Sequence, residues 1–181
     1  MLVEKKGCYA GTCRQLDFLD GARGNNPFHP YVSYLHVERE GETTIMVTTD
    51  GRRIHKIESD KLPAIFAPGE FKMLKCKEGW NLEPVKNTMA FPDWKKVIPK
   101  YTVEPVAIKD CYKKNRGKDL SQAIVKVFDT AKAVLDADYL LDVLSFDGPW
   151  AFTYASDTPE KNGIAFQNHE KYALVMPFAR D

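Results

Sequence analysis

The stretch Thr48-Thr49-Asp50-Gly51-Arg52-Arg53-Ile54 joins two strand-like runs, residues 43–49 and 52–58. Both runs are enriched in β-branched residues and partly alternate between apolar and polar side chains, as half-buried strands do. Asp-Gly between two such runs is a strong hairpin signal, because a type I′ turn needs positive φ at both of its central residues. The stretch therefore predicts an antiparallel hairpin in the first half of the chain.

Elements of several kinds are expected around this hairpin. An apolar stripe predicts a helix over 12–23 with Thr12 as its N-cap, and glycines then mark a loop that is ended by Pro30. The remaining patterns of the first half predict a strand over 31–38, a strand over 62–67, a short helix that starts at Pro68-Gly69-Glu70, and an edge strand over 79–89 that Pro84 interrupts.

The second half opens with residues 91–99, which prolines bound and which we expect to be an extended connector with a domain boundary after it. The clearest helix signal is 136–144, where Asp136 or Asp138 complements the dipole at the N-terminus. The other expected elements are strands at 101–108, 124–128, 150–155, 163–167 and 172–176 and a basic loop at 109–118. The whole pattern predicts an α+β fold rich in antiparallel pairing.

Composition excludes several classes of protein. The chain has 181 residues, 44% of them hydrophobic, which is enough to bury a core, and 26 Lys+Arg balance 25 Asp+Glu, so net charge does not demand a nucleic-acid partner. Neither a leader nor an apolar run of membrane-spanning length occurs, which indicates a cytoplasmic protein and no membrane partner.

Cysteines and histidines do not form a recognisable metal-binding pattern. Cys8, Cys13, Cys76 and Cys111 are scattered, and we expect them to be reduced thiols. A cross-strand contact between His36 and His55 is conceivable, although their setting does not favour a metal. Nucleophile-elbow, Walker and HExxH motifs are all missing from the sequence, so we expect no cofactor, no metal and no catalytic residue.

Four segments of the chain resemble the bacterial DNA polymerase sliding clamp (β subunit) family, in the family's order. Thr49-Asp50-Gly51-Arg52-Arg53-Ile54 is similar to the family's Thr-Asp-Gly-x-Arg-Leu hairpin, and Phe91-Pro92-Asp93-Trp94-Lys95-Lys96-Val97-Ile98-Pro99 to its connector between the middle and last domains. Residues 138–144 resemble a helix late in the last domain, and Tyr172-Ala173-Leu174-Val175-Met176-Pro177 its C-terminal strand.

The resemblance implies the clamp fold, a non-catalytic role in replication, and a hydrophobic groove for short peptides of DNA polymerase, clamp loader and repair proteins. Apolar walls with a few fixed polar groups suit such a groove, and here Arg53 and exposed backbone at Gly51 would supply the polar groups. Carried over by position, the groove residues are Val32, Thr49, Gly51, Arg53, Ile54, Pro99, Leu174, Met176 and Pro177.

The resemblance also implies a division into a middle-domain counterpart at 1–99 and a reduced last-domain counterpart at 100–181. Between Pro99 and Asp136 there is too little chain for the usual helix and strands of a domain's first half, and the family's first domain has no counterpart. Encircling double-stranded DNA would then take a homo-oligomeric ring, with Arg14, Arg23 and Lys72 on inward helices contacting phosphates.

Two alternatives remain open from the sequence. One is a monomeric clamp-like interaction module or decoy that regulates replication proteins without a ring. The other is an unrecognised metal-dependent enzyme that uses the carboxylates of Asp136, Asp138 and Asp142.

Overall fold

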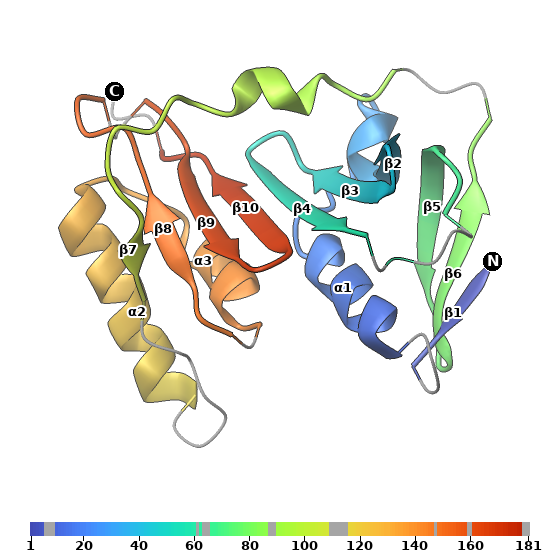
Figure 1. The fold of residues 1–181 in the computed structure, drawn as a ribbon, viewed down its shortest axis with the longest axis horizontal. Helices are drawn as coiled ribbons and strands as arrows, with labels where there is room; N and C mark the ends of the chain where they lie inside the picture. The colour runs from blue at the N-terminus through green and yellow to red at the C-terminus, as the bar shows by residue number, and fades with distance from the viewer. Residues whose placement is uncertain are drawn as a thin grey trace. The chain divides into compact units, whose positions relative to one another are not determined.

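The predicted hairpin lies inside the sheet of a first compact unit, Met1–Pro92, and a second unit covers Asp93–Asp181 (Figure 1). The computed structural model describes residues 1–5, 10–60, 62, 66–86, 90–108, 116–146, 148–158 and 161–178. Each unit consists of an antiparallel sheet with helices on one face, which confirms the predicted α+β class.

In the first unit, β3 (Thr43–Thr49) pairs with β4 (Arg53–Ser59), with Thr49 opposite Ile54, which confirms the hairpin. The strand order is β1 (Leu2–Glu4), β6 (Gly79–Pro84), β5 (Gly69–Lys75), β2 (Tyr34–Glu40), β3 and β4. The residues before β2 form a 3₁₀ helix, η2 (Pro30–Ser33), so the strand predicted over 31–38 begins at Tyr34.

Three expectations in this unit are wrong. The helix predicted from Pro68 is the strand β5, because Phe71 and Met73 are buried while Lys72 and Leu74 are exposed, an alternation with period two. The segment 79–84 is not an edge strand, since β1 pairs with its other side and Pro84 is its last residue. Of the strand predicted over 62–67, residues 62, 66 and 67 are not in a strand and 63–65 lie outside the described residues.

Helix α1 (Ala10–Asp20) lies on one face of this sheet. It ends before Arg23, and the prediction that Thr12 is its N-cap is wrong, because Thr12 lies inside the helix. The last carbonyls of a helix lack intrahelical partners. Two strand side chains supply partners: Thr48 Oγ1 donates to the carbonyl of Leu19 at 2.5 Å, and His55 Nδ1 donates to that of Phe18 at 2.7 Å. Side chains of β3 and β4 thus fix the C-terminal end of α1 on the hairpin.

His55 is fully buried, and its ring stacks on Phe18 with 4.4 Å between the centroids. A carbonyl oxygen can only accept, so Nδ1 carries the proton, while Nε2 has no hydrogen-bond partner among the described residues. The conceivable contact between His36 and His55 is wrong, because the His36 ring contacts Glu38, Glu70 and Phe91 instead.

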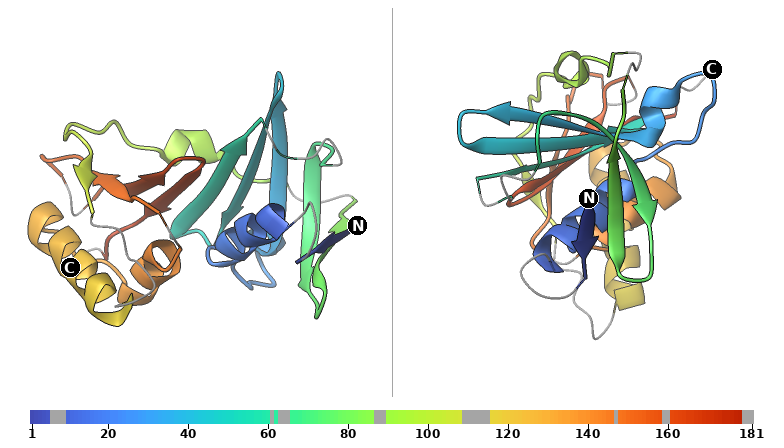
Figure 2. Two further views of the ribbon diagram at one scale, coloured as in Figure 1. Left: turned by 60° about the horizontal axis from the view of Figure 1, so that its bottom comes forward. Right: turned by 90° about the vertical axis from the view of Figure 1, so that its right-hand side faces the viewer.

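The second unit begins with a 3₁₀ helix, η3 (Trp94–Val97), inside the segment expected to be extended. Its sheet has the order β10 (Lys171–Val175), β9 (Ile164–Asn168), β8 (Ala151–Thr153) and β7 (Val106–Ala107). Helices α2 (Arg116–Ala131) and α3 (Ala137–Leu144) lie together on one face of this sheet (Figure 2).

Helix α2 overturns two expectations. The strand predicted over 124–128 is helical, because Ala123, Val127 and Ala131 are buried at intervals of four residues. The chain between Pro99 and Asp136 is also not too short, since it holds both β7 and this helix. The strand predicted over 101–108 reduces to Val106–Ala107. Most of the predicted basic loop, 109–115, lies outside the described residues, and α2 begins at Arg116.

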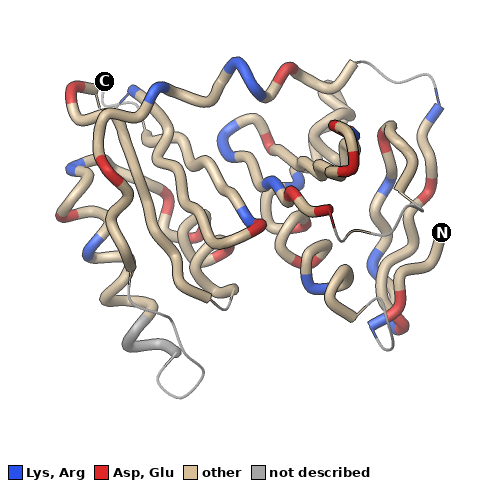
Figure 3. The backbone as a smooth tube through the Cα atoms, in the orientation of Figure 1, with Lys and Arg blue, Asp and Glu red and all other residues tan. Residues whose placement is uncertain are grey.

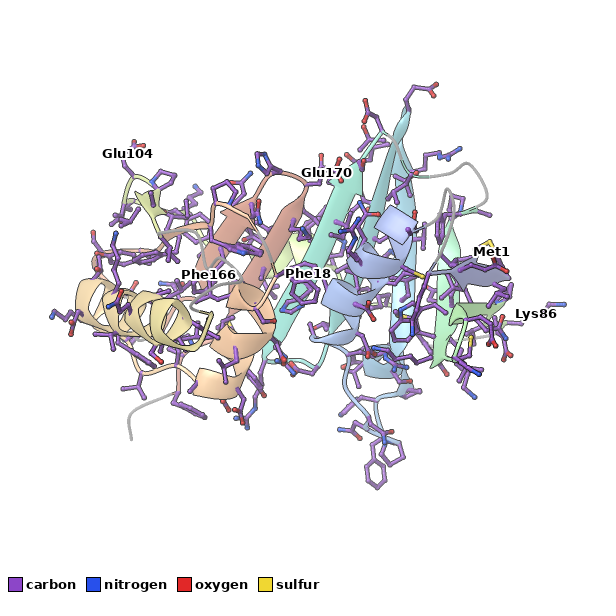
Figure 4. All side chains as sticks on the ribbon, turned by 90° about the horizontal axis from the view of Figure 1, so that it is seen from below. Met1, Phe18, Lys86, Glu104, Phe166 and Glu170 are labelled. Atoms are coloured by element: carbon purple, nitrogen blue, oxygen red, sulfur yellow. The ribbon has the colours of Figure 1, made fainter. Side chains whose placement is uncertain are left out.

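The helix predicted over 136–144 and the last three predicted strands are confirmed, with bounds that differ by one or two residues. Asp136 is the N-cap of α3, and its Oδ1 accepts from the backbone N of Asp138 at 2.9 Å. Trp150 and Phe152 are buried, so the aromatic alternation serves core packing. Figure 4 marks Phe18 and Phe166, which are fully buried in the cores of their respective units, whereas the labelled Lys86 extends outward.

Cys13 is buried and Cys76 half-buried, both as free thiols, while Cys8 and Cys111 lie outside the described residues. Burial raises the pKa of the Cys13 thiol. Among the described helices, none combines the length and the apolar character that crossing a membrane takes.

The buried His55 predicts a pH-dependent stability. Burial lowers its pKa from 6.5 to about 3 in the folded protein, so the unfolded chain binds the proton first as the pH falls. The stability that comes from keeping His55 neutral is fully present above pH 6.5 and is lost progressively as the pH falls toward 3. For His55 alone, the free energy of unfolding should fall by about 2 kcal/mol between pH 7 and pH 5.

Urea denaturation of the full chain at these two pH values measures the difference, with His55→Phe as the reference. The variant should lose this part of the pH dependence whatever its absolute stability. Equal pH dependence in both proteins would contradict the assignment of a neutral, buried His55.

Candidate functional site

The turn between β3 and β4 is held by the carboxylate of Asp50. Its Oδ1 accepts from the backbone N of Arg52 at 2.8 Å and of Arg53 at 2.9 Å, and its Oδ2 accepts from Arg53 Nε at 2.9 Å. The turn is not the predicted type I′ turn, because only Gly51 has positive φ, +88°, within it. The Asp50 side chain supplies the order that two left-handed residues would otherwise give.

Thr49 closes the same turn from the other side. Its Oγ1 accepts from the backbone N of Gly51 at 3.0 Å and donates to the carbonyl of Arg53 at 2.7 Å. The N–H of Gly51 is therefore already bonded within the turn. Gly51 itself is exposed, and the Arg53 side chain is 11% exposed beside Asp50.

Two apolar residues of the first unit support this turn rather than project from it. Val32 in η2 is 4% exposed and Ile54 in β4 is 5% exposed. Thr49 is buried to the same degree. Of the five predicted site residues in this unit, Gly51 and Arg53 are thus the ones with most surface for contact.

The second unit contributes Pro99, Leu174, Met176 and Pro177. Leu174, on β10, is buried, while Met176, just beyond the strand, is 36% exposed. Pro99 and Pro177 are half-buried. Met176 is therefore the most accessible apolar side chain of this set.

A pair of tyrosines fastens the segment after Pro99 to β10. The hydroxyl groups of Tyr101 and Tyr172 lie 2.7 Å apart, and burial raises the pKa of both phenols, so both stay protonated at neutral pH. Tyr101 follows Pro99 by two residues and Tyr172 precedes Leu174 by two. This bond holds the end of the connector to the strand that carries Leu174.

The three residues expected to contact DNA have different settings. Arg14 is exposed on α1. Arg23 lies beyond the helix and donates to the Met73 carbonyl at 2.8 Å and to Asp20 Oδ1 at 2.9 Å, and Lys72 is exposed on β5. Of the three, only Arg14 is on a helix, so the expected helical position of Arg23 and Lys72 is wrong. Figure 3 shows basic and acidic residues interspersed along both units.

The three carboxylates proposed for a metal-dependent enzyme lie at the start of α3 or within it. Asp136 caps α3, Asp138 is exposed and Asp142 is half-buried. Across the part of the chain that the structure describes, no group of three or more His, Cys, Asp or Glu residues could hold a metal ion.

Comparison with solved structures identifies the fold. The DNA polymerase III subunit β from Pseudomonas aeruginosa is 16% identical, with a TM-score of 0.62 over 93% of this chain and 64% of its own. The β subunit from Thermotoga maritima is 12% identical, with a TM-score of 0.63 over 95% of this chain and 64% of its own. The β chain from Streptococcus pneumoniae is 10% identical, with a TM-score of 0.61 over 94% and 63%.

These similarities establish the DNA clamp fold, and the chain spans about 64% of the length of these structures. No protein-family model and no curated protein sequence matches the chain.

Gly163 provides a test of the packing behind Met176. A Cβ on Gly163 would overlap Leu174 Cδ1 and lie 2.8 Å from Leu174 Cγ and 3.1 Å from Met176 Sδ. Gly163→Ala should therefore lower the free energy of unfolding by about 1–3 kcal/mol, the usual cost of overpacking a core. Urea denaturation measures the change.

Gly11→Ala is the matched control, because a Cβ on Gly11 meets nothing within 4 Å and alanine favours the helix. A Gly163→Ala protein as stable as this control would contradict the close packing of Leu174.

Proposed function

We propose that this chain, which has the fold of the DNA polymerase III β sliding clamps, is a non-catalytic accessory protein of DNA replication. It binds short peptides of DNA polymerase and other partner proteins and acts in the cytoplasm. The main support is the match to solved clamps over 93% of the chain at a TM-score of 0.62.

Each unit has its own set of residues for peptide binding. Gly51, Arg53, Pro99, Met176 and Pro177 contact the peptide, since they are at least partly accessible. The buried residues of the set, Val32, Thr49, Ile54 and Leu174, support these contacts from below. A flexible thioether beside rigid prolines suits the binding of apolar side chains of varied shape.

The proposed function includes a homo-oligomeric ring around double-stranded DNA. Arg14 then makes a phosphate contact, because it is an exposed cation on the helix face of the first unit. The second candidate is a monomeric clamp-like module that binds the same peptides without DNA. The internal bonds of Arg23 favour it, since they remove one of the expected DNA contacts.

Peptide binding is tested with a short hydrophobic clamp-binding peptide, titrated by fluorescence anisotropy. Met176→Ala should weaken binding about tenfold, the effect of removing a central apolar contact. Met176 is preferred over Ile54 as the test position, because Ile54 is buried and its replacement would also destabilise the first unit.

Leu74→Ala is the matched control, since Leu74 on β5 is 37% exposed and belongs to neither residue set. Unchanged peptide affinity in Met176→Ala would show that the second unit's set is wrongly assigned. A wild-type protein that does not bind the peptide would refute the proposed function.

The ring is tested by sedimentation with and without nicked circular double-stranded DNA. We expect an oligomer that circular DNA retains and that linearising the DNA releases. Arg14→Ala should reduce the dependence of DNA affinity on salt by about one phosphate contact. A protein that stays monomeric at high concentration and is not retained would leave the interaction module as the function.

A further inference from the structure

Gly24 lies in the loop between α1 and η2, and its backbone closes that loop. Its N–H donates to the carbonyl of Val32 at 2.8 Å, while the N–H of Val32 donates to the carbonyl of His29 at 3.1 Å. The two ends of the loop 24–32 are therefore side by side, shortly before β2 begins at Tyr34.

Gly24 also contacts the turn between β3 and β4. A Cβ at this position would lie 2.9 Å from Val32 Cγ2, 3.1 Å from Asp50 Cβ and 3.2 Å from the backbone Cα of Asp50. Its φ is not in the left-handed region, so the backbone conformation does not require glycine. The missing side chain is what allows Val32 and Asp50 to approach from two sides.

The loop has little freedom to move away from this contact. Arg23, the preceding residue, is held through its side chain by the Met73 carbonyl at 2.8 Å and by Asp20 at 2.9 Å. Its backbone N–H donates to the Asp20 carbonyl at 3.1 Å. A side chain added at position 24 must therefore displace Val32 or Asp50 rather than its own segment.

Displacement of Asp50 would change the whole turn. The carboxylate of Asp50 binds the backbone N of Arg52 and of Arg53, and it also binds Arg53 Nε. A shift of Asp50 by a few tenths of an ångström would change the geometry of all three bonds, whose lengths lie between 2.8 and 2.9 Å.

We propose that Gly24 is a positioning residue for the first unit's part of the peptide site, an inference that rests on the proposed peptide-binding function. It fixes Val32 and Asp50 against each other, and through Asp50 it sets the direction of the Arg53 guanidinium. Asp50 is a second positioning residue, because it acts on a peptide only through Arg53 and the turn.

The test compares Gly24→Ala with Gly11→Ala in the full chain. In the absence of any peptide, Gly24→Ala should shift the NMR amide signals of Gly51, Arg52 and Arg53, whereas Gly11→Ala should leave them in place. Affinity for a short hydrophobic clamp-binding peptide should fall about five- to tenfold in Gly24→Ala only.

Two further variants separate positioning from a general loss of stability. Adding Val32→Ala to Gly24→Ala removes the nearest atom, so part of the amide shifts should return to the wild-type positions. Asp50→Asn keeps an oxygen for the backbone N–H groups but loses the acceptor of Arg53 Nε, so it should weaken peptide binding while the turn amides move little.

The outcomes are distinguishable. Amide signals of the turn that stay in place in Gly24→Ala, or wild-type peptide affinity in both Gly24→Ala and Asp50→Asn, would overturn the inference. A wild-type protein that binds no peptide would overturn the proposed function instead, and the amide shifts would still decide whether Gly24 holds the turn.

Discussion

The first unit depends on the bonds that Thr48 and His55 make to the last carbonyls of α1. They add a side-chain donor to each of two carbonyls near the helix end, which also accept the backbone N–H groups of Gly21 and Ala22. They also fix the helix to the hairpin, so that the chain leaving α1 passes directly over the turn. The contact of Gly24 with Asp50 follows from this anchoring, and it adds a contact from a distant part of the sequence to the bonds that Thr49 and Asp50 make within the turn.

Elements with strong local signals could be predicted from the sequence. The hairpin around Asp50-Gly51 and the helix capped by Asp136 are both specified within a few residues. Prediction was wrong where a short pattern suits two structures. Phe71 and Leu74 fit one side of a helix. The structure instead has the strand β5, in which Phe71 and Met73 share one face and which pairs with β2 and β6. Residues 124–128 are mostly β-branched or apolar, so this short run by itself fits a strand. It belongs instead to the sixteen-residue helix α2.

The residues of the candidate site could be named from the sequence, but which of them are buried could not. The residues carried over from the resemblance lie on the β3–β4 turn, η2, the connector and the C-terminal segment, and several of them are buried. The Asp-Gly pair could have suggested an Asx-type turn instead of a type I′ turn, because Asp side chains bind backbone groups two residues on. The bond between Tyr101 and Tyr172 and the contact of Gly24 with Asp50 join residues 71 and 26 positions apart. Periodicity within one element cannot indicate contacts of this kind.

The pairing of β1 with β6 has a consequence for how the first unit forms during synthesis. Strands β2, β3 and β4 follow one another in the chain and pair as successive hairpins, so they can assemble as soon as they leave the ribosome. Leu2–Glu4, by contrast, pairs with Gly79–Asn81 and must remain without its partner until nearly the whole unit has been made. Leu2–Glu4 is therefore an unpaired strand in the nascent chain until β6 has been made, and chaperones protect segments of this kind.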